Sequence, residues 1–385
     1  MRIARLLTGF GLTALFLASC NVNAPFDPTN VFRPLDDALE NAEQFADNLV
    51  EDPLGSKPFP VIIGGDNAKV FYATNLGDVR VNFPGPTNDL VFPLFDGPSN
   101  LYSIENKTRD LVRPLVPASG AFGLVTDGDS FAYLSSEDPN SRPISLVSDS
   151  VYFPAPTVVF QSRPEDGTTL LVGLLAMDAG RLAFVVTDEN SQTAVLHLED
   201  LYGTVPGLEI ETKWITAIDL KGARLAYAGA DLDGVLRIHL RDLNADTDTT
   251  VAELRAEFGV WGLGLTENRL FWEETVDYER SRVVVFDVPT NETRVWADSA
   301  PGRFAGANDE YFVTEEYFER DNGAGVYTIR RFDELGREKK LATFRADGLA
   351  GQTTVLGDRV VWVNPDRKIV ITPLAGGDRI SFRPY

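Results

Sequence analysis

The chain has 385 residues, with 57 acidic and 35 basic side chains and a net charge of −22 at pH 7. This excess of acid argues against nucleic-acid binding and against direct docking on anionic lipid headgroups, because both need basic surface patches. The 32 glycines, 23 prolines and 24 phenylalanines suit a β-rich core with many turns.

The first twenty residues have the pattern of a bacterial lipoprotein signal. A short positive segment, Met1–Arg5, precedes an apolar run over Leu6–Leu17, and the run ends in the tetrad Leu17-Ala18-Ser19-Cys20. The run is too short to span a membrane comfortably and fits a secretory signal segment. The tetrad resembles the lipobox, which implies cleavage before Cys20 and diacylation of its thiol. The alternative is an ordinary signal peptide that happens to end near a cysteine.

Residues 1–19 are therefore predicted to be a lipoprotein signal peptide, and Cys20 is predicted to anchor the mature chain in a membrane. Cys20 is the only cysteine, so its lipidation would leave no thiol for a disulfide or a metal site. Loss of Arg2 and Arg5 changes the net charge to about −24. Asn21 stands where an aspartate would favour inner-membrane retention, so we expect the outer membrane, on its periplasmic or its outer face.

The next two segments differ in pattern. Residues 20–33 contain two prolines and no periodicity, which indicates a flexible tether. Residues 34–58 form a helical N-terminal segment in this interpretation, because apolar residues recur at helical spacing and predict a short helix over Leu35–Val50. Its apolar stripe would pack on the side of the following domain or plug one face, or else dock on a partner.

Residues 59–385 show repeated short strands joined by turn-forming residues. The clearest unit has four runs, at Val260–Leu265, Arg269–Glu273, Arg282–Val288 and Thr293–Ala297. Four strands joined by tight turns form a small antiparallel meander, which is too small to be stable alone and needs neighbouring repeats.

The repeat has a period typical of a β-propeller. Its second strand carries an aromatic or apolar dyad, and the second members of successive dyads are 61, 51, 43, 45, 41 and 49 positions apart. Periods near 40–50 residues with several strands each are typical of propeller blades. We predict an all-β propeller of seven four-stranded antiparallel blades, with six or eight as alternatives. The long first interval indicates an insertion, and a strand around Phe59–Ile63 is expected to help close the ring. The dyads are Phe71-Tyr72, Ala132-Tyr133, Ala183-Phe184, Ala226-Tyr227, Phe271-Trp272, Phe312-Val313 and Val361-Trp362.

Two further features recur in the repeats. Small residues mark the innermost strand, which suits strands that crowd toward a central axis. An aspartate ends the third strand at Asp200, Asp242, Asp287 and Asp333. These aspartates could form a ligand ring, but we expect them to hold the turn into the fourth strand through backbone hydrogen bonds. The only two histidines, His197 and His239, share one register in consecutive repeats, and neighbouring blades about 10 Å apart would hold them too far apart for one zinc ion.

Acidic residues gather after the second strand of three repeats. Asp231, Asp233, Glu273 and Glu274 could offer oxygen ligands to calcium, and Asp277, Glu315, Glu316 and Glu319 extend the pattern. The interpretation we favour is a solvated acidic rim formed by second-to-third-strand hairpins. No cofactor is therefore expected, with calcium as the open possibility.

The repeats resemble TolB-like and YWTD-like β-propellers. The closest segments are Asn268-Arg269-Leu270-Phe271-Trp272-Glu273 and Gly357-Asp358-Arg359-Val360-Val361-Trp362. The Ser-Pro-Asp-Gly turn of TolB-type blades and the full Tyr-Trp-Thr-Asp tetrad are missing. The resemblance runs from about Gly120 to the C-terminus and implies protein or ligand binding on a propeller face in the bacterial envelope, without assigning any site.

Two classes of function follow. We favour a lipid-anchored scaffold that binds another envelope protein or an extracellular ligand and is itself monomeric. The alternative is a propeller enzyme, such as a lactonase-like hydrolase with a divalent metal in the channel. The carboxylates and amides at the ends of innermost strands, Asp178, Asp219, Asn308 and Asp309, could serve that metal, although such positions also form turns. No Gly-x-Ser-x-Gly elbow and no phosphate-binding loop occurs in the sequence, so we assign no catalytic residue.

Overall fold

The computed structural model describes residues 59–383 apart from short connecting segments at 67, 76, 84–87, 95–99, 106–107, 115–119, 137–144, 152–155, 163–169, 189–192, 204–206, 255–259, 276–279, 320–324 and 347–352. The predicted signal peptide, Cys20, the tether and the predicted helix lie outside the described residues. All regular elements of the described part are strands, and none of its segments is a helix long and apolar enough to cross a membrane.

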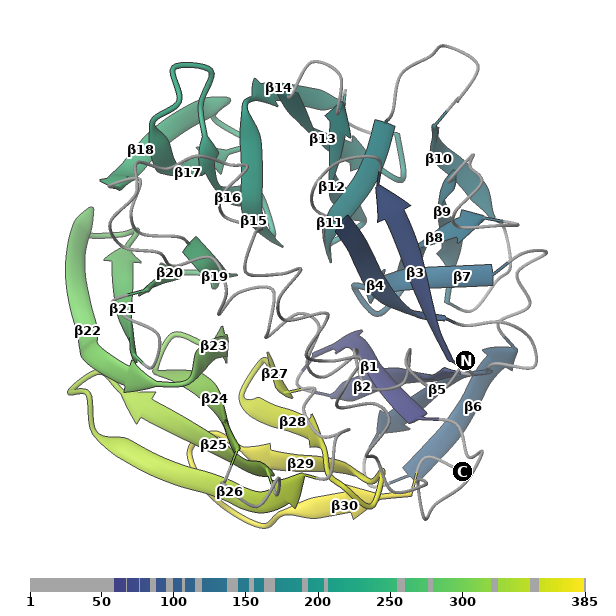
Figure 1. Cartoon of the computed structure of the whole chain (residues 1–385), viewed down its shortest axis with the longest axis vertical. Helices are drawn as coiled ribbons and strands as arrows, with labels where there is room; N and C mark the ends of the chain where they lie inside the picture. The colour runs from purple at the N-terminus through teal and green to yellow at the C-terminus, as the bar shows by residue number, and fades with distance from the viewer. Residues whose placement is uncertain are drawn as a thin grey trace.

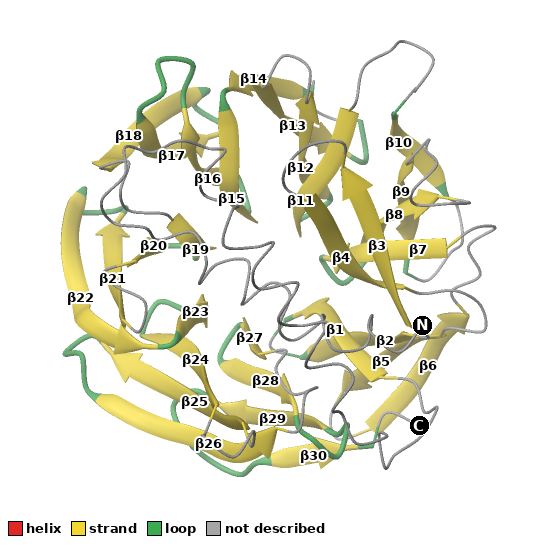
Figure 2. Ribbon diagram, viewed as in Figure 1, coloured by secondary structure: helices red, strands yellow, loops and turns green. Residues whose placement is uncertain are grey.

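The strands follow one another as four-stranded antiparallel units around a ring (Figures 1 and 2). This arrangement confirms the all-β propeller. We call the units blades 1 to 7 in chain order. Blades 1 and 2 share an eight-stranded sheet, in which β1 and β7 pair in parallel at Gly64 and Thr126. The other five blades are separate sheets.

The strand bounds are as follows. Blade 1 has β1 (Phe59–Gly65), β2 (Lys69–Asn75), β5 (Asn100–Glu105) and β6 (Thr108–Pro114), and blade 2 has β7 (Gly120–Thr126), β8 (Ser130–Ser136), β9 (Ser145–Ser150) and β10 (Thr157–Gln161). Blade 3 has β11 (Leu170–Asp178), β12 (Arg181–Asp188), β13 (Thr193–Asp200) and β14 (Leu208–Thr212), and blade 4 has β15 (Trp214–Lys221), β16 (Arg224–Ala230), β17 (Leu236–Asp242) and β18 (Thr247–Leu254). Blade 5 has β19 (Val260–Leu265), β20 (Arg269–Thr275), β21 (Arg280–Asp287) and β22 (Glu292–Pro301). Blade 6 has β23 (Arg303–Ala307), β24 (Tyr311–Glu319), β25 (Gly325–Asp333) and β26 (Glu338–Ala346), and blade 7 has β27 (Thr353–Leu356), β28 (Arg359–Val363), β29 (Ile369–Pro373) and β30 (Ile380–Phe382).

The long first interval of the repeat has a structural cause. A hairpin of β3 (Gly77–Phe83) and β4 (Asn88–Leu94) is inserted between the second and third strands of blade 1. Its two strands pair only with each other, and β4 lies beside β7 (Figure 1). The insertion expected in this interval is therefore a separate two-stranded element.

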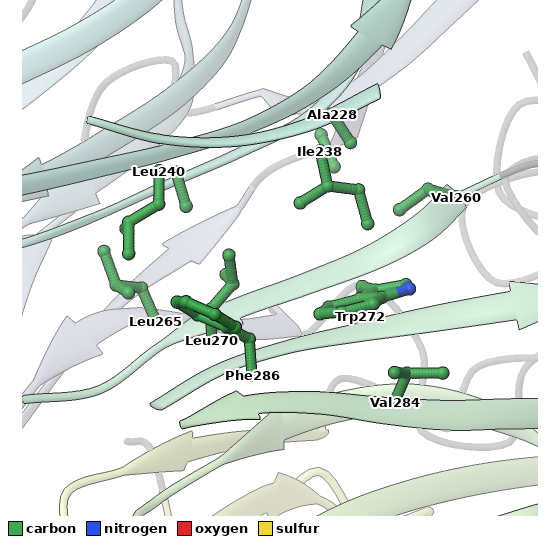
Figure 3. Close-up of a cluster of buried hydrophobic side chains, with 11 residues drawn as sticks. Ala228, Ile238, Leu240, Val260, Leu265, Leu270, Trp272, Val284 and Phe286 are labelled. Carbon is green, nitrogen blue, oxygen red and sulfur yellow. The ribbon is translucent and has the colours of Figure 1, made fainter. Parts of the chain in front are cut away.

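The seven dyads lie in the seven second strands and supply core residues on both sides of each blade. Successive side chains of a strand point to opposite faces, so each dyad contacts two neighbouring blades. In blade 5, Trp272 packs with Ala226 and Ala228 of blade 4, whereas Phe271 packs with Phe312 of blade 6. Figure 3 shows Trp272 among the side chains of the first cluster. The small alanines of blade 4 leave room for the indole ring.

The small residues of the innermost strands allow neighbouring blades to approach closely. A Cβ atom added to Gly262 would lie 2.7 Å from Cβ of Phe304, and one added to Gly264 would lie 2.8 Å from Cζ of the same phenylalanine. Both contacts join β19 to β23 of the next blade. These clashes confirm that crowding near the axis selects small residues in blade 5.

The ring closes differently from our prediction. We expected a strand around Phe59–Ile63 to help close the ring, but this segment is the innermost strand of blade 1 and pairs with β2. Blade 7 already has four strands of its own, so it has no strand missing. Closure instead depends on side chains, because Val70 and Tyr72 of blade 1 share an apolar cluster with Val361 of blade 7.

Candidate functional site

Polar side chains at the ends of the innermost strands bind the adjacent blade. Asp178 accepts a hydrogen bond from the Gly222 backbone N–H at 2.7 Å and contacts Lys221 Nζ at 2.9 Å. Asp219 accepts one from the Leu265 N–H at 2.6 Å. Both aspartates were candidate ligands for a metal in the channel. In the structure, the oxygens of Asp178 join blade 3 to blade 4, and those of Asp219 join blade 4 to blade 5.

Arginines at the start of the second strands form a second set of links between blades. Each donates from its guanidinium to a backbone oxygen in the turn of the following blade. The pairs are Arg181 with Gly222, Arg224 with Glu267, Arg269 with Asp309, and Arg359 with Asp66. The last pair connects blade 7 to blade 1, so it completes the ring with the same contact that other junctions use.

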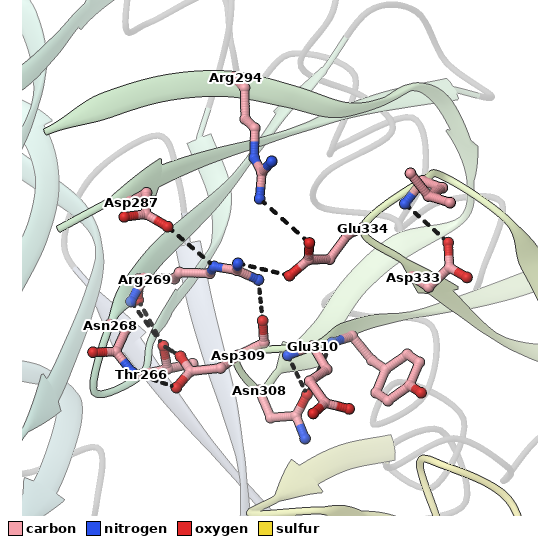
Figure 4. A network of polar contacts seen from close by, with 12 residues as sticks. Thr266, Asn268, Arg269, Asp287, Arg294, Asn308, Asp309, Glu310, Asp333 and Glu334 are labelled. Atoms are coloured by element: carbon pink, nitrogen blue, oxygen red, sulfur yellow. Dashed lines mark hydrogen bonds and ion pairs between the residues drawn. The ribbon is translucent and has the colours of Figure 1, made fainter. Parts of the chain in front are cut away.

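The junction of blades 5 and 6 has the densest of these networks (Figure 4). Arg269 contacts Asp287 of its own blade at 3.5 Å and Glu334 of blade 6 at 2.7 Å. Asp309 accepts hydrogen bonds from Thr266 Oγ1 and from Asn268 Nδ2. Asn308 extends the chain of contacts to blade 7, where its amide donates to Asp358 at 3.1 Å. All four groups at strand ends thus lie in contacts between blades.

The carboxyl group of Asp219 makes the stability of the ring depend on pH. Burial raises its pKa to about 6, although two backbone N–H groups, from Leu265 and Leu220, act against this rise. A folded-state pKa above the unfolded value means that the folded state binds the proton more tightly. The stabilisation is therefore present below about pH 4 and is lost as the pH rises toward 6, at a cost of at most about 3 kcal/mol.

This dependence can be measured with Asp219→Asn, which keeps the shape and cannot ionise. We expect the free energy of unfolding of the wild type, relative to the variant, to fall between pH 4 and 6 and then to level off. Urea unfolding across this range, followed by circular dichroism, gives the difference directly. If the free energies of unfolding of the two proteins changed in parallel with pH, the raised pKa of Asp219 would be contradicted.

The third-strand aspartates hold turns, as predicted. Asp200 accepts from the Tyr202 N–H, and Asp242 accepts from the N–H groups of Asn244 and Ala245, each at 2.9 Å. Asp287 and Asp333 accept from backbone N–H groups two to four residues later. The hydrogen bond from Ala245 lowers the pKa of Asp242, as expected for a carboxylate that caps a turn.

The two histidines stack on the second strands of their blades. The His197 ring lies 4.9 Å from that of Phe184, and the His239 ring lies 4.5 Å from that of Tyr227. Burial lowers the pKa of His197, with Glu209 acting in the opposite direction. Each imidazole thus occupies a packed position of its own blade. His239 also lies near two carboxylates, 3.2 Å from Asp231 and 3.4 Å from Asp248.

The predicted acidic rim is only partly solvated. Asp231 and Asp233 lie in the hairpin between β16 and β17, and both contact Arg237, at 2.6 and 2.9 Å. Glu273 and Glu274 are each 4% exposed, so the solvated rim is wrong for these residues. The reason is that both residues lie within β20, which continues to Thr275, and donors from β21 and from blade 6 reach their side chains. Asp277 and the side chain of Glu319 lie outside the described part.

Three buried glutamates, two near the end of β20 and one in the middle of β24, form the candidate site. Glu273 accepts from Ser281 Oγ through one oxygen and from the Phe304 N–H, at 2.7 Å, through the other. Burial raises the pKa of Glu273, and these two donors act against the rise. Glu274 accepts from Trp272 Nε1 and from Arg282 Nε, both at 2.8 Å.

The third glutamate, Glu315, is held in the same way. It is 5% exposed, and it accepts from Arg303 Nε at 2.6 Å and from the Tyr327 hydroxyl. Burial and the nearby Glu315 carboxylate raise the pKa of Tyr327 well above its usual value, so its hydroxyl stays a donor. Each of the three glutamates therefore has both oxygens occupied by donors of the protein. Among the described residues, no group of three or more His, Cys, Asp or Glu side chains is placed to hold a metal ion.

Comparisons with known proteins support the fold. No protein-family model and no curated protein sequence matches the chain. Among solved structures, an oligogalacturonate lyase in complex with manganese is 14% identical with a TM-score of 0.52, covering 85% of this chain and 88% of that chain. An uncharacterized protein from Listeria monocytogenes is 11% identical with a TM-score of 0.52, and the match covers 85% of this chain and 95% of that chain. TolB from Acinetobacter baumannii is 12% identical with a TM-score of 0.44, and the match covers 83% of this chain and 71% of that chain. At these identities, the first two structures, with TM-scores of 0.52, show a shared fold alone.

Proposed function

We propose that this chain is a lipid-anchored β-propeller of the bacterial cell envelope that binds another envelope protein or an extracellular ligand. The tetrad that ends in Cys20 supports the anchor, because its pattern resembles a lipobox. The anchor and its place in the outer membrane are part of the proposal. The ring of linked blades would supply a rigid platform, since loops on a rigid scaffold are common binding sites.

One observation carries the choice of binding over catalysis. The buried carboxylates Glu273, Glu274 and Glu315 have the environment in which catalytic groups are often found. General acid–base catalysis by a carboxylate needs one of its oxygens within hydrogen-bond reach of the substrate. In this site every carboxylate oxygen already accepts a hydrogen bond from the protein. The cluster therefore supports bracing of blades 5 and 6 as its role.

The experiment is crosslinking in native membranes followed by affinity purification of the full chain. The tag is placed at the C-terminus so that Cys20 stays free. We expect the protein in the membrane fraction, joined in stoichiometric amount to one partner through crosslinks that map to a single face of the ring. Cys20→Ala should move the protein to the soluble fraction.

Other results would contradict parts of the proposal. A membrane location that persists in Cys20→Ala would remove the lipid anchor. Purification of the protein alone after crosslinking would count against the protein-binding function. Metal analysis and hydrolase assays would then test the alternative, a propeller enzyme with a divalent metal in its channel.

A further inference from the structure

The outer edge of blades 6 and 7 is basic in a strongly acidic protein. Strand β26 carries Lys339, Lys340 and Arg345, all exposed, and Arg379 lies in the last turn of blade 7. None of these four side chains forms an ion pair with the described residues. The sequence as a whole predicts no basic patch, because net charge averages over the surface and hides this local excess.

Two of these cations, Lys339 and Arg379, lie at the junction between the two blades together with Arg331 of β25. Arg331 and Lys339 are directly opposite each other in the β25–β26 pair, so their side chains lie on one face with Cβ atoms about 5 Å apart. Lys339 Nζ reaches blade 7, where it lies 3.5 Å from the position of a Cβ atom on Gly376. Arg379 comes from the other side and donates to the backbone oxygen of Leu341 in β26.

The two arginines are held in place by aromatic rings. The Arg331 guanidinium lies 4.4 Å from the centre of the Tyr311 ring, and that of Arg379 lies 5.1 Å from the centre of the Trp362 ring. Stacking on a ring fixes the orientation of each guanidinium group, and its N–H groups point outward in its own plane, where an anion can accept from them. Both rings belong to the core that blades 6 and 7 share.

One donor in this cluster is buried without an acceptor. Nη1 of Arg331 has no hydrogen-bond partner, although it is shielded from solvent. Such a donor is costly and calls for a bound water or ion. The acidic side chains next to it in sequence cannot serve, because Asp333 is bound to Arg337 and Glu338 to Arg330. Asp378, beside Arg379, is exposed and forms no ion pair with the described residues.

We propose that Arg331, Lys339 and Arg379 form a binding site for a phosphate-type oxyanion at the junction of blades 6 and 7. The planar guanidinium groups of the two arginines and the ammonium group of the lysine match the several oxygens of a phosphoryl group. The anion would supply the acceptor that Arg331 lacks and would offset the repulsion among three cations. A free phosphorylated ligand and a phospholipid headgroup share this chemistry. The site does not depend on the proposed scaffold function.

The test uses the full chain in non-ionic detergent at constant ionic strength. Isothermal titration with inorganic phosphate measures the affinity. We expect Lys339→Ala and Arg379→Ala each to weaken phosphate binding about tenfold, the loss of one charge-assisted contact. Arg337→Ala is the matched control, because it removes an exposed cation of the same turn that is already paired with Asp333. Its affinity should stay within about twofold of wild type.

A second titration distinguishes the sources of the phosphate. Short-chain phosphatidylglycerol that binds more tightly than inorganic phosphate, with the same sensitivity to Arg379→Ala, would identify a lipid headgroup. Equal or weaker binding would identify a soluble phosphorylated ligand. The proposal is overturned if wild type binds neither probe, if both site variants bind like wild type, or if Arg337→Ala loses as much affinity as they do.

Discussion

Replacing Trp272 with alanine is expected to lower the free energy of unfolding by about 3–5 kcal/mol, the range for loss of a large buried aromatic. The indole is 1% exposed and fills the space left by Ala226 and Ala228 of blade 4. Alanine would leave a cavity between two blades, and partial collapse cannot fill it without moving a whole sheet. The change would also remove the donor to Glu274, leaving one oxygen of a buried carboxylate without a partner.

Urea unfolding followed by far-ultraviolet circular dichroism measures this effect without relying on tryptophan emission. Leu335→Ala is a suitable control, since Leu335 is 75% exposed and its truncation should change stability by less than about 0.5 kcal/mol. A loss below about 1 kcal/mol for Trp272→Ala would show that the contact between blades 4 and 5 contributes little.

Glu315→Ala is expected to cost about 3 kcal/mol of folding stability. The change leaves the buried Tyr327 hydroxyl without its acceptor and removes the ion pair with Arg303. Arg303 is partly exposed and can regain water, so the main loss comes from the tyrosine and from the hydrogen bonds of the carboxylate. The same urea unfolding assay at neutral pH gives the difference.

The neighbouring residue supplies a matched control. Glu316 forms an ion pair with Arg330 at 2.7 Å but is 31% exposed, so Glu316→Ala should cost less than about 1 kcal/mol. Tyr327→Phe, alone and combined with Glu315→Ala, then isolates the coupling between the two side chains. Equal losses at positions 315 and 316 would mean that burial adds nothing to the contact.

The strand pattern of this protein could be predicted from local sequence. The runs over Val260–Leu265 and Arg269–Glu273 correspond to β19 and to most of β20 because turn residues bound them on both sides. The dyads mark the second strands because those strands are buried on both faces and tolerate few polar residues. The turn-holding role of Asp242 was likewise predictable, since its donors lie within three residues.

Contacts between distant residues could not be predicted in this way. Glu273 and Glu274 have the same sequence signature as a solvated turn, and only the positions of Ser281, Phe304 and Arg282 make them interior residues. Those donors come from another strand and another blade, and no local pattern indicates them. An alternative signal was available in Trp272, because a buried indole N–H needs an acceptor nearby.

Closure by side chains has a consequence for how such a ring can change in size. Every four-stranded sheet is built from consecutive residues, and only the β1–β7 bridge joins one sheet to the next through the backbone. Duplication or deletion of one whole repeat would leave no sheet with a missing strand. The circumference would change, and Arg359 or its counterpart would still meet a backbone oxygen of the next turn. Ring size in this architecture is then limited by how neighbouring blades pack against each other, and the order of the strands sets no limit of its own.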